Sequence, residues 1–431
     1  MGGGLMQLVA YGAQDIYLTG NPQITFFKVV YRRHTNFSME AIQQTFNGTP
    51  SISGSTMTST ISRNGDLVGR LWLDVGIDRN VLVDTGTYAN WTNNTGHAFV
   101  KECEIEIGGQ RIDRHYSQWL DVWNELSDHY ESEWSGLNKH SAKDAYLNSG
   151  SAGDSAGAEV TRLYVPLQFW FCRNPGLALP LIALQYHEVK IKLTTRSLAG
   201  LVNGSTQVTT PTTEPDVKLW ADYIYLDTDE RRRFAQVSHE YLIEQLQRET
   251  GTMSASQKLN FNHPVKELIW TVQATTATTE GASRGVLMDA TNNVPTTNAS
   301  AFENNDYFNY SPGSVGETEI INGQSSVEGF TDLRLQLNGH DRFATRNASY
   351  FRTCQPLQAG HKVPSKHIYC YSFALKPEEH QPSGTCNFSR IDNAKMVFTG
   401  GDTTNTQLTV WAVNYNVLRI MSGMGGLAYS N

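Results

Sequence analysis

Two segments of the chain contain the same hairpin pattern, and this repetition constrains the fold more than any other feature. Residues 103–107 (CEIEI) precede the pair Gly108-Gly109, and residues 333–337 (LRLQL) precede the pair Asn338-Gly339. In both segments apolar and polar residues alternate, as in a half-buried strand. The pair that follows can adopt the positive φ values that a two-residue type I′ turn requires. The sequence therefore predicts two β-hairpins.

The segments around the two hairpins also follow the same order. Each hairpin has an apolar segment with a tryptophan before it, and two strand-like segments and a final aromatic strand after it. In the first half these segments are 66–74, 163–171, 185–193 and 219–226, and in the second half they are 264–272, 368–375, 391–398 and 408–418. Five elements in one order predict a tandem duplication of an all-β unit of about 200 residues, which is a plausible size for one sandwich domain.

The composition supports this class of fold. The 431 residues, 39% of them hydrophobic, are enough for two cores, and the 36 glycines suit many short strands joined by turns. A formal net charge of −8 disfavours nucleic acid as a main partner, because phosphate binding needs a basic surface. No apolar run approaches the roughly 20 residues of a membrane helix, and the N-terminus lacks the pattern of a secretory signal. The five cysteines form no C-x-x-C pair, so we expect folding in a reducing compartment without disulfides.

A short helix is predicted between the two units, at residues 227–236, where carboxylates near the start suit helix capping and the helix dipole. Residues 241–247 fit either a helix or a strand. The chain is therefore divided into an N-terminal arm (1–24), a first domain (25–226), a linker (227–240) and a second domain (241–431). Three long polar inserts, at 81–99, 137–159 and 274–329, cannot belong to a core and are expected to form outer loops.

A search for catalytic or ligand-binding motifs finds none. None of the 12 histidines forms the H-x-H pair of a cupin-type metal site, and His239-Glu240 lacks the second histidine of a zinc-protease helix, because Ile243 occupies that position. The glycines at 423–426 follow the final strand instead of opening a helix, so they match a nucleotide loop poorly. No G-x-S-x-G nucleophile motif is present. The sequence thus predicts no catalytic, cofactor-binding or metal-binding residues and a protein that is not an enzyme.

Several ordered segments resemble a known family. The segment GAQDIYLTGNPQITFFKVVYRR at 12–33 is similar to the N-terminal signature of the major capsid proteins of large icosahedral nucleocytoplasmic DNA viruses, especially those that infect algae. Further similar segments are 107–113, 175–188, 337–344, 382–392 and 416–428. The resemblance covers the whole chain apart from the loops, and so many long segments make it far more specific than one short motif.

The resemblance implies an all-β fold of two tandem eight-stranded antiparallel jelly-roll sandwiches, a double jelly roll. It also implies a structural role in the virion, in which three chains form a homotrimeric capsomer with six sandwiches and a nearly hexagonal outline. The expected partners are neighbouring capsomers and minor capsid proteins, and assembly would take place in the host cytoplasm. In the family the arm lies at the inner face, where Arg32 and Arg33 would contact those partners; simple solvation of the two arginines is equally compatible with the sequence.

Family members from algal viruses carry glycans on loop asparagines. The pattern N-x-S/T occurs nine times here, and Asn36, Asn347 and Asn387 lie in segments expected to be packed. The glycosylation candidates in predicted outer loops are Asn90, Asn93, Asn298, Asn309 and Asn405, the last outside the N-x-S/T pattern.

Two alternatives remain open from the sequence. A minor capsid paralogue at special lattice positions would have the same fold. A carbohydrate- or receptor-binding β-sandwich would also show polar loops with aromatic residues, and Tyr307, Phe308 and Tyr310 would then stack on sugars. For the capsid protein itself, host-surface glycans are a further partner expected at the outer loops.

Overall fold

The structure is a computed structural model that describes the strands and most of the connections. The described residues are 35–78, 89–92, 94–127, 160–204, 213–275, 307–310, 320–321, 324–325, 328–401, 403 and 406–429. Phe37–Asn431 forms one compact unit, separate from Met1–Asn36. The predicted arm at 1–24 lies outside the described residues.

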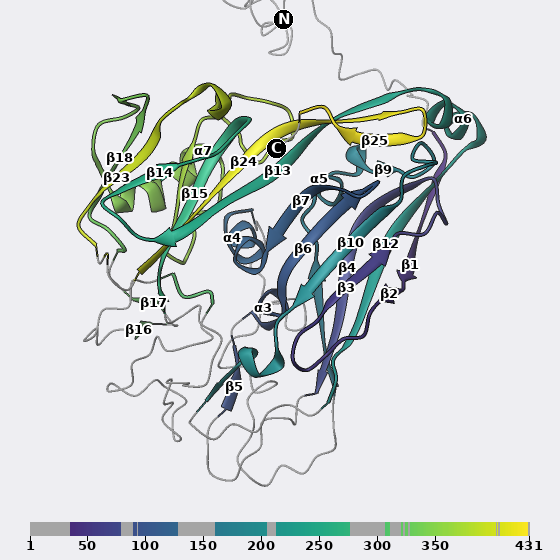
Figure 1. Cartoon of the computed structure of the whole chain (residues 1–431), viewed down its shortest axis with the longest axis horizontal. Helices are drawn as coiled ribbons and strands as arrows, with labels where there is room; N and C mark the ends of the chain where they lie inside the picture. Colours follow the sequence, from purple (N-terminus) through teal and green to yellow (C-terminus); the bar gives the residue numbers. More distant parts are fainter. Residues whose placement is uncertain are drawn as a thin grey trace, which may run out of the picture. The chain divides into compact units, whose positions relative to one another are not determined.

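The first half of this unit is a sandwich of two antiparallel sheets (Figure 1). One sheet has the order β1 (Phe37–Gln44), β12 (Asp216–Leu226), β4 (Leu67–Asp78) and β8 (Val160–Pro166), with β9 (Leu179–Pro180) beside β4. The other has the order β2 (Phe46–Asn47), β3 (Thr56–Thr60), β10 (Val189–Thr195), β6 (Val100–Ile107) and β7 (Gln110–Tyr116).

The second half repeats this arrangement. One sheet has the order β13 (His239–Thr252), β24 (Thr406–Met421), β15 (Pro264–Ala274) and β21 (Ile368–Ser372), with β22 (Cys386–Asn387) beside β15 and β25 (Met424–Leu427) beside β24. The other has the order β14 (Ser256–Leu259), β23 (Ala394–Thr399), β18 (Asp332–Leu337) and β19 (His340–Asp341), with β20 (Arg346–Asn347) beside β18. In both halves the first and last long strands are neighbours in one sheet, which is jelly-roll connectivity. The predicted double jelly roll is confirmed.

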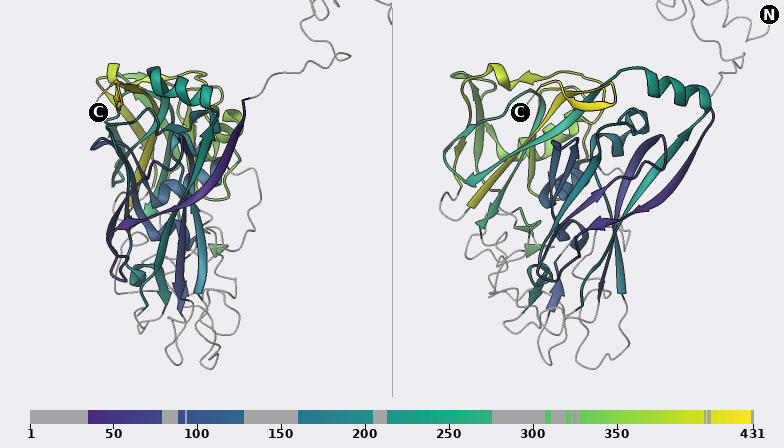
Figure 2. Two further views of the ribbon diagram at one scale, coloured as in Figure 1. Left: turned by 90° about the vertical axis from the view of Figure 1, so that its right-hand side faces the viewer. Right: turned by 45° about the vertical axis from the view of Figure 1, so that its right-hand side comes forward.

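Helices and short strands connect these sheets. The helix α6 (Thr228–Gln236) follows the last strand of the first sandwich and leads into β13, as predicted (Figure 2). The other helical segments are α3 (Thr95–Phe99), α4 (Ser117–Ser127), α5 (Trp170–Arg173), η2 (Pro175–Leu177), η3 (Leu198–Leu201), η5 (Tyr350–Cys354), α7 (Gln355–Ala359) and η6 (Phe388–Arg390). Two small ribbons pair β5 (Ala89–Trp91) with β11 (Val202–Gly204) and β16 (Ile320–Ile321) with β17 (Gln324–Ser325). No helix of the described residues is long and apolar enough to cross a membrane.

Both predicted hairpin turns have the expected backbone geometry. Gly108 and Gly109 have φ values of 59° and 82°, and Asn338 and Gly339 have 52° and 83°. Two successive positive φ values define the type I′ turn. The alternation predicted for the first hairpin is confirmed as well, because β6 buries every second side chain, including Cys103 and Ile105.

The Gly108-Gly109 turn provides a test within two adjacent residues. A Cβ atom at Gly108 would lie 2.3 Å from Nδ1 of His187, whereas a Cβ at Gly109 would have no neighbour within 4 Å. Gly109→Ala is therefore expected to cost only the backbone strain, about 1–2 kcal/mol, since its φ is positive. Gly108→Ala adds a steric clash and is expected to cost more. Urea denaturation of the two variants measures the difference, and equal losses of stability would contradict this account.

Some boundaries differ from those expected. Residues 163–171 are not one strand, because β8 ends at Pro166, which has no N–H to continue a ladder, and the helix α5 begins at Trp170. The segment 185–193 becomes a strand only at Val189. Residues 241–247 belong to a strand, and β13 already begins at His239, inside the predicted linker.

The start of α6 differs in detail as well. The side chain of Asp227 caps no helix N–H; the backbone oxygen of Asp227 accepts the N–H of Arg231 instead. The guanidinium of Arg231 pairs with Asp66 at 3.0 Å. The acidic residues Asp229 and Glu230 do lie in the first turn, where they suit the dipole.

Candidate functional site: the junction between the sandwiches

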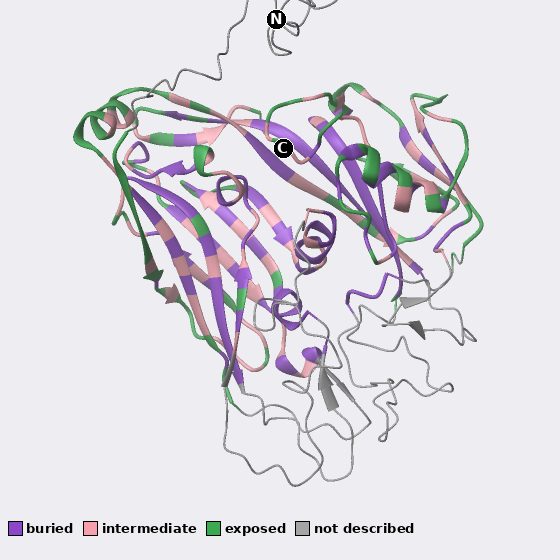
Figure 3. Ribbon diagram, turned by 180° about the vertical axis from the view of Figure 1, so that it is seen from behind, coloured by how far each residue is buried: buried purple, intermediate pink, exposed green. Residues whose placement is uncertain are grey.

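The β13–β24–β15–β21 sheet is buried on both faces. On one face Trp270, Leu408 and Val410 pack into the core of the second sandwich. On the opposite face Ile269 and Trp411 belong to a core that is continuous with the first sandwich. The burial pattern of β24 shows this directly, with nine successive buried residues (Figure 3). The two sandwiches therefore share a hydrophobic junction.

The helix α4 of the first sandwich covers this face. Trp411 is 0% exposed, and its ring centroid lies 6.2 Å from that of Trp119 on α4. Trp119 in turn lies 5.5 Å from Trp123 one turn further along the helix. Three indole rings thus form the centre of the junction.

Polar contacts fix the register of β13 against the first sandwich. The side-chain amide of Gln245 donates to the backbone oxygen of Ile112, and the N–H of Leu246 donates to Oδ1 of Asp113 at 3.1 Å. The guanidinium of Arg248 lies 3.6 Å from the ring centroid of Tyr116. These contacts are directional, so they restrict sliding or rotation of one sandwich on the other, which dispersion contacts alone would restrict less.

A buried carboxylate at the junction is bound by one cation from each sandwich. Glu244 on β13 lies 2.8 Å from Nζ of Lys266, whose side chain is 0% exposed, and 3.0 Å from Nη1 of Arg173 on α5. Lys266 also donates to the backbone oxygen of Pro377. A buried charge is tolerated only when it is paired and hydrogen-bonded. Here the Glu244 carboxylate and the Lys266 ammonium group both have partners.

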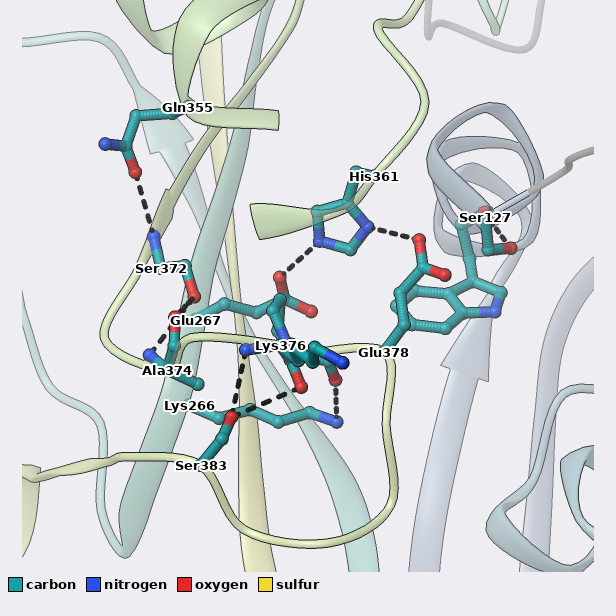
Figure 4. A network of polar contacts seen from close by, with 12 residues as sticks. Ser127, Lys266, Glu267, Gln355, His361, Ser372, Ala374, Lys376, Glu378 and Ser383 are labelled. Atoms are coloured by element: carbon teal, nitrogen blue, oxygen red, sulfur yellow. Dashed lines mark hydrogen bonds and ion pairs between the residues drawn. The ribbon is translucent and has the colours of Figure 1, made fainter. Parts of the chain in front are cut away.

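A second buried cluster contains His361 between two carboxylates (Figure 4). Nε2 of His361 lies 2.8 Å from Glu267, and Nδ1 lies 2.6 Å from Glu378. The side chains of His361 and Glu267 are both 0% exposed. Burial disfavours the imidazolium, but the charges of Glu267 and then Glu378 outweigh burial and raise the pKa of His361 to about 9. Burial likewise opposes ionisation of Glu267, yet the His361 charge leaves the pKa of this carboxyl below its ordinary value.

This raised pKa predicts a loss of stability in alkali. The stabilising contribution of protonated His361 is fully present below its unfolded pKa of about 6.5 and is lost as the pH rises through about 9. This pKa shift corresponds to at most about 3 kcal/mol of folding free energy. Thermal melts between pH 7 and pH 10 should show the loss, and His361→Leu should reduce it. An identical alkaline loss in wild type and variant would contradict the assignment to His361.

A third cluster surrounds Asp121 on α4, which is 0% exposed. Both carboxylate oxygens lie 2.7 Å from Nζ of Lys366 in the second half, and Oδ2 accepts the hydroxyl of Tyr310 at 2.7 Å. Asn94 donates to Oδ1 at 2.8 Å. This carboxylate therefore connects α4 with segments that lie far apart in the sequence.

The Asp121 cluster argues against one alternative left open by the sequence. In a carbohydrate-binding sandwich Tyr307, Phe308 and Tyr310 would stack on sugars, but they are only 1%, 4% and 1% exposed. The hydroxyl of Tyr307 donates to the backbone oxygen of Gly200 at 2.7 Å, and the guanidinium of Arg196 covers its ring. These aromatic residues attach the insert to the core, so they are not available to a ligand.

The predicted glycosylation sites have different outcomes. Asn309 is 2% exposed, and its backbone oxygen accepts the side-chain amide of Gln273, so burial contradicts the outer position expected of it. Asn90 lies in β5, whose side chains are not described. The candidates and arm residues that lie outside the described residues are Asn93, Asn298, Asn405, Arg32 and Arg33.

Three asparagines expected to be packed are exposed instead: Asn36, Asn347 and Asn387. The side-chain oxygens of Asn347 and Asn387 accept the N–H groups of Ser349 and Ser389, each at 3.1 Å. Both asparagines therefore have a structural role in local turns. Within the described residues, no group of three or more His, Cys, Asp and Glu side chains could hold a metal ion.

The fold and this junction define a class of protein in which two jelly rolls are fused side by side. The model of the family "Major capsid protein N-terminus" matches residues 25–227, and that of "Large eukaryotic DNA virus major capsid protein" matches residues 230–426. The chain belongs to this family of major capsid proteins, and its role is that of a structural capsid protein.

Individual relatives agree with this assignment. The major capsid protein of Pyramimonas orientalis virus is 50% identical over 460 residues, and that of Paramecium bursaria Chlorella virus 1 is 44% identical over 465 residues; both alignments cover 100% of each chain. A solved structure of the latter virus's capsid matches with a TM-score of 0.73 and 38% identity, covering 94% of this chain and 100% of that chain. The Faustovirus major capsid protein, at 13% identity and a TM-score of 0.67 over 95% of this chain and 94% of that one, shares the fold.

Proposed function

We propose that three copies of this chain form a homotrimeric capsomer that presents six sandwiches and tiles an icosahedral shell. The shared core between the two sandwiches carries this proposal. Because Trp411 and the ionic clusters hold the sandwiches together, one chain supplies two fixed sides of a six-sided ring. A closed threefold assembly of such chains has a nearly hexagonal outline and packs into a lattice.

Within this proposal the chain's role is architectural and not catalytic. The Glu244 and Asp121 clusters join the two sandwiches, and the His361 cluster lies within the second sandwich, so these buried groups serve stability. The partners would be neighbouring capsomers and minor capsid proteins, with assembly in the host cytoplasm and a location in the virion. Arg32 and Arg33 remain proposed contacts at the inner face.

Sedimentation equilibrium of the purified protein tests the trimer. The expected mass is three times the chain mass of 48.0 kDa, unchanged on moderate dilution. A species of 48.0 kDa at high concentration would contradict the proposal. Quantitative mass spectrometry of virions separates a major from a minor capsid protein by copy number. The same virions test glycans at Asn90, Asn93, Asn298 and Asn405, because an intact mass equal to that of the bare chain would exclude them.

A further inference from the structure

The outward face of the β1–β12–β4–β8 sheet carries large apolar side chains at the surface. Phe37 and Met39 on β1 are 59% and 56% exposed, and Tyr164 on β8 is 42% exposed. Between them Trp220 on β12 lies opposite Trp72 on β4, and both are partly exposed. The exposed face of an antiparallel sheet is normally polar, so an apolar patch of this kind marks an interaction site.

The second sandwich provides an internal comparison for the Trp72–Trp220 face. Trp220 lies between Leu219 and Ala221 in the last long strand of its sandwich, and Trp411 lies between Val410 and Ala412 in the corresponding strand. Each strand is the neighbour of the first strand in its sheet, and both tryptophans point away from their own core. Trp411 is fully buried because α4 of the first sandwich covers it. Trp220, by contrast, is partly exposed.

The counterpart of α4 is exposed in the second sandwich. The helix α4 follows β7, and η5–α7 follows β20 at the corresponding place in the repeat. Leu120 of α4 and Phe351 of η5 are both buried in a hydrophobic core. Beyond them, however, Leu357 of α7 is 69% exposed and Val363 is 40% exposed.

This exposed strip continues directly from the established junction. The N–H of Lys362 donates to the backbone oxygen of Leu126 at the end of α4, at 2.8 Å.

We propose that the Trp72–Trp220 face binds the η5–α7 segment of a second copy of this chain, repeating between chains the contact that α4 makes with Trp411 within one chain. This inference rests on the proposed trimer. In the trimer, contacts within a chain (α4 on Trp411) would then alternate with contacts between chains (η5–α7 on Trp220). The third copy would bind the first in the same way and close the ring. The binding energy should be centred on the tryptophans, since large aromatic residues dominate such interfaces.

Photo-crosslinking and charge substitution test the surface. With p-benzoylphenylalanine at position 220, irradiation is expected to join two chains and to attach the crosslink to peptides within residues 350–363. Trp220→Glu and Leu357→Glu are each expected to weaken trimer association at least tenfold, whereas Tyr186→Glu, at a residue 76% exposed outside both surfaces, should leave association unchanged. Circular dichroism confirms that each variant is folded.

The outcomes separate this inference from the proposed function. If the wild type is a trimer but Trp220→Glu also remains a trimer and the crosslinks map elsewhere, the proposed contact is wrong and the trimer stands. A wild type that is monomeric at high concentration overturns both. Crosslinks to residues 350–363 together with dissociation of both folded variants support the contact.

Discussion

Replacing Trp411 with alanine is expected to lower the free energy of unfolding by about 3–5 kcal/mol, the range for truncating a fully buried tryptophan. The side chain is 0% exposed and packs against Trp119 across the junction. Its loss leaves a cavity where the two sandwiches meet, which the rigid sheets around it cannot close. Urea denaturation followed by circular dichroism measures the effect.

Trp220→Ala is the matched control. It removes the same side chain from the equivalent strand of the first sandwich, but Trp220 is partly exposed. We expect a loss of only about 1–2 kcal/mol when measured on the dissociated chain. Equal losses for the two variants, or a loss below about 1 kcal/mol for Trp411→Ala, would contradict a shared core at the junction.

His361→Leu is expected to cost a further large amount, about 3–5 kcal/mol at pH 7, because it leaves Glu267 as an unpaired buried charge. Glu267 is 0% exposed, and one of its carboxylate oxygens already has no hydrogen-bond partner. The double variant with Glu267→Leu removes both charges and is expected to recover much of the loss, since apolar replacement of a buried pair is often nearly neutral. Urea denaturation of the single and double variants measures this.

An exposed ion pair serves as the control for His361. Lys376 and Glu379 lie 2.9 Å apart with side chains 66% and 58% exposed. Lys376→Ala should leave stability almost unchanged, because an exposed ion pair contributes little. If His361→Leu lowered stability no more than Lys376→Ala does, the His361–Glu267 pair would not be what stabilises this region. A double variant less stable than His361→Leu alone would show the same.

The duplicated hairpins were predictable because their signals are local. Alternating polarity and a Gly-Gly or Asn-Gly pair determine strand, turn and register within about ten residues. The same applies to α6, with its acidic start between two strand segments. The end of β8 was placed too late because an apolar run does not distinguish a strand from the short helix that follows it.

The helix α4 shows a signal that was available and missed. Trp119, Leu120, Trp123 and Leu126 recur at helical spacing, and all are buried. The equivalent position of η5–α7 in the second half would have strengthened that prediction. The burial of Tyr307 and Tyr310 had no such local signal. In a long polar insert, the sequence around an aromatic residue does not indicate whether that residue packs into the core.

The ionic clusters of the junction were beyond local sequence reasoning. Asp121 and Lys366 are 245 residues apart in the chain, and Arg173 and Glu244 are 71 apart. Only the packing of one sandwich on the other brings them together. These long-range contacts fix the two similar domains against each other as one rigid unit.

Electron microscopy of the purified protein is the decisive measurement for the proposed capsomer. We expect threefold particles in which six sandwich-sized densities give a nearly hexagonal outline. Isolated two-lobed monomers at high protein concentration would contradict it.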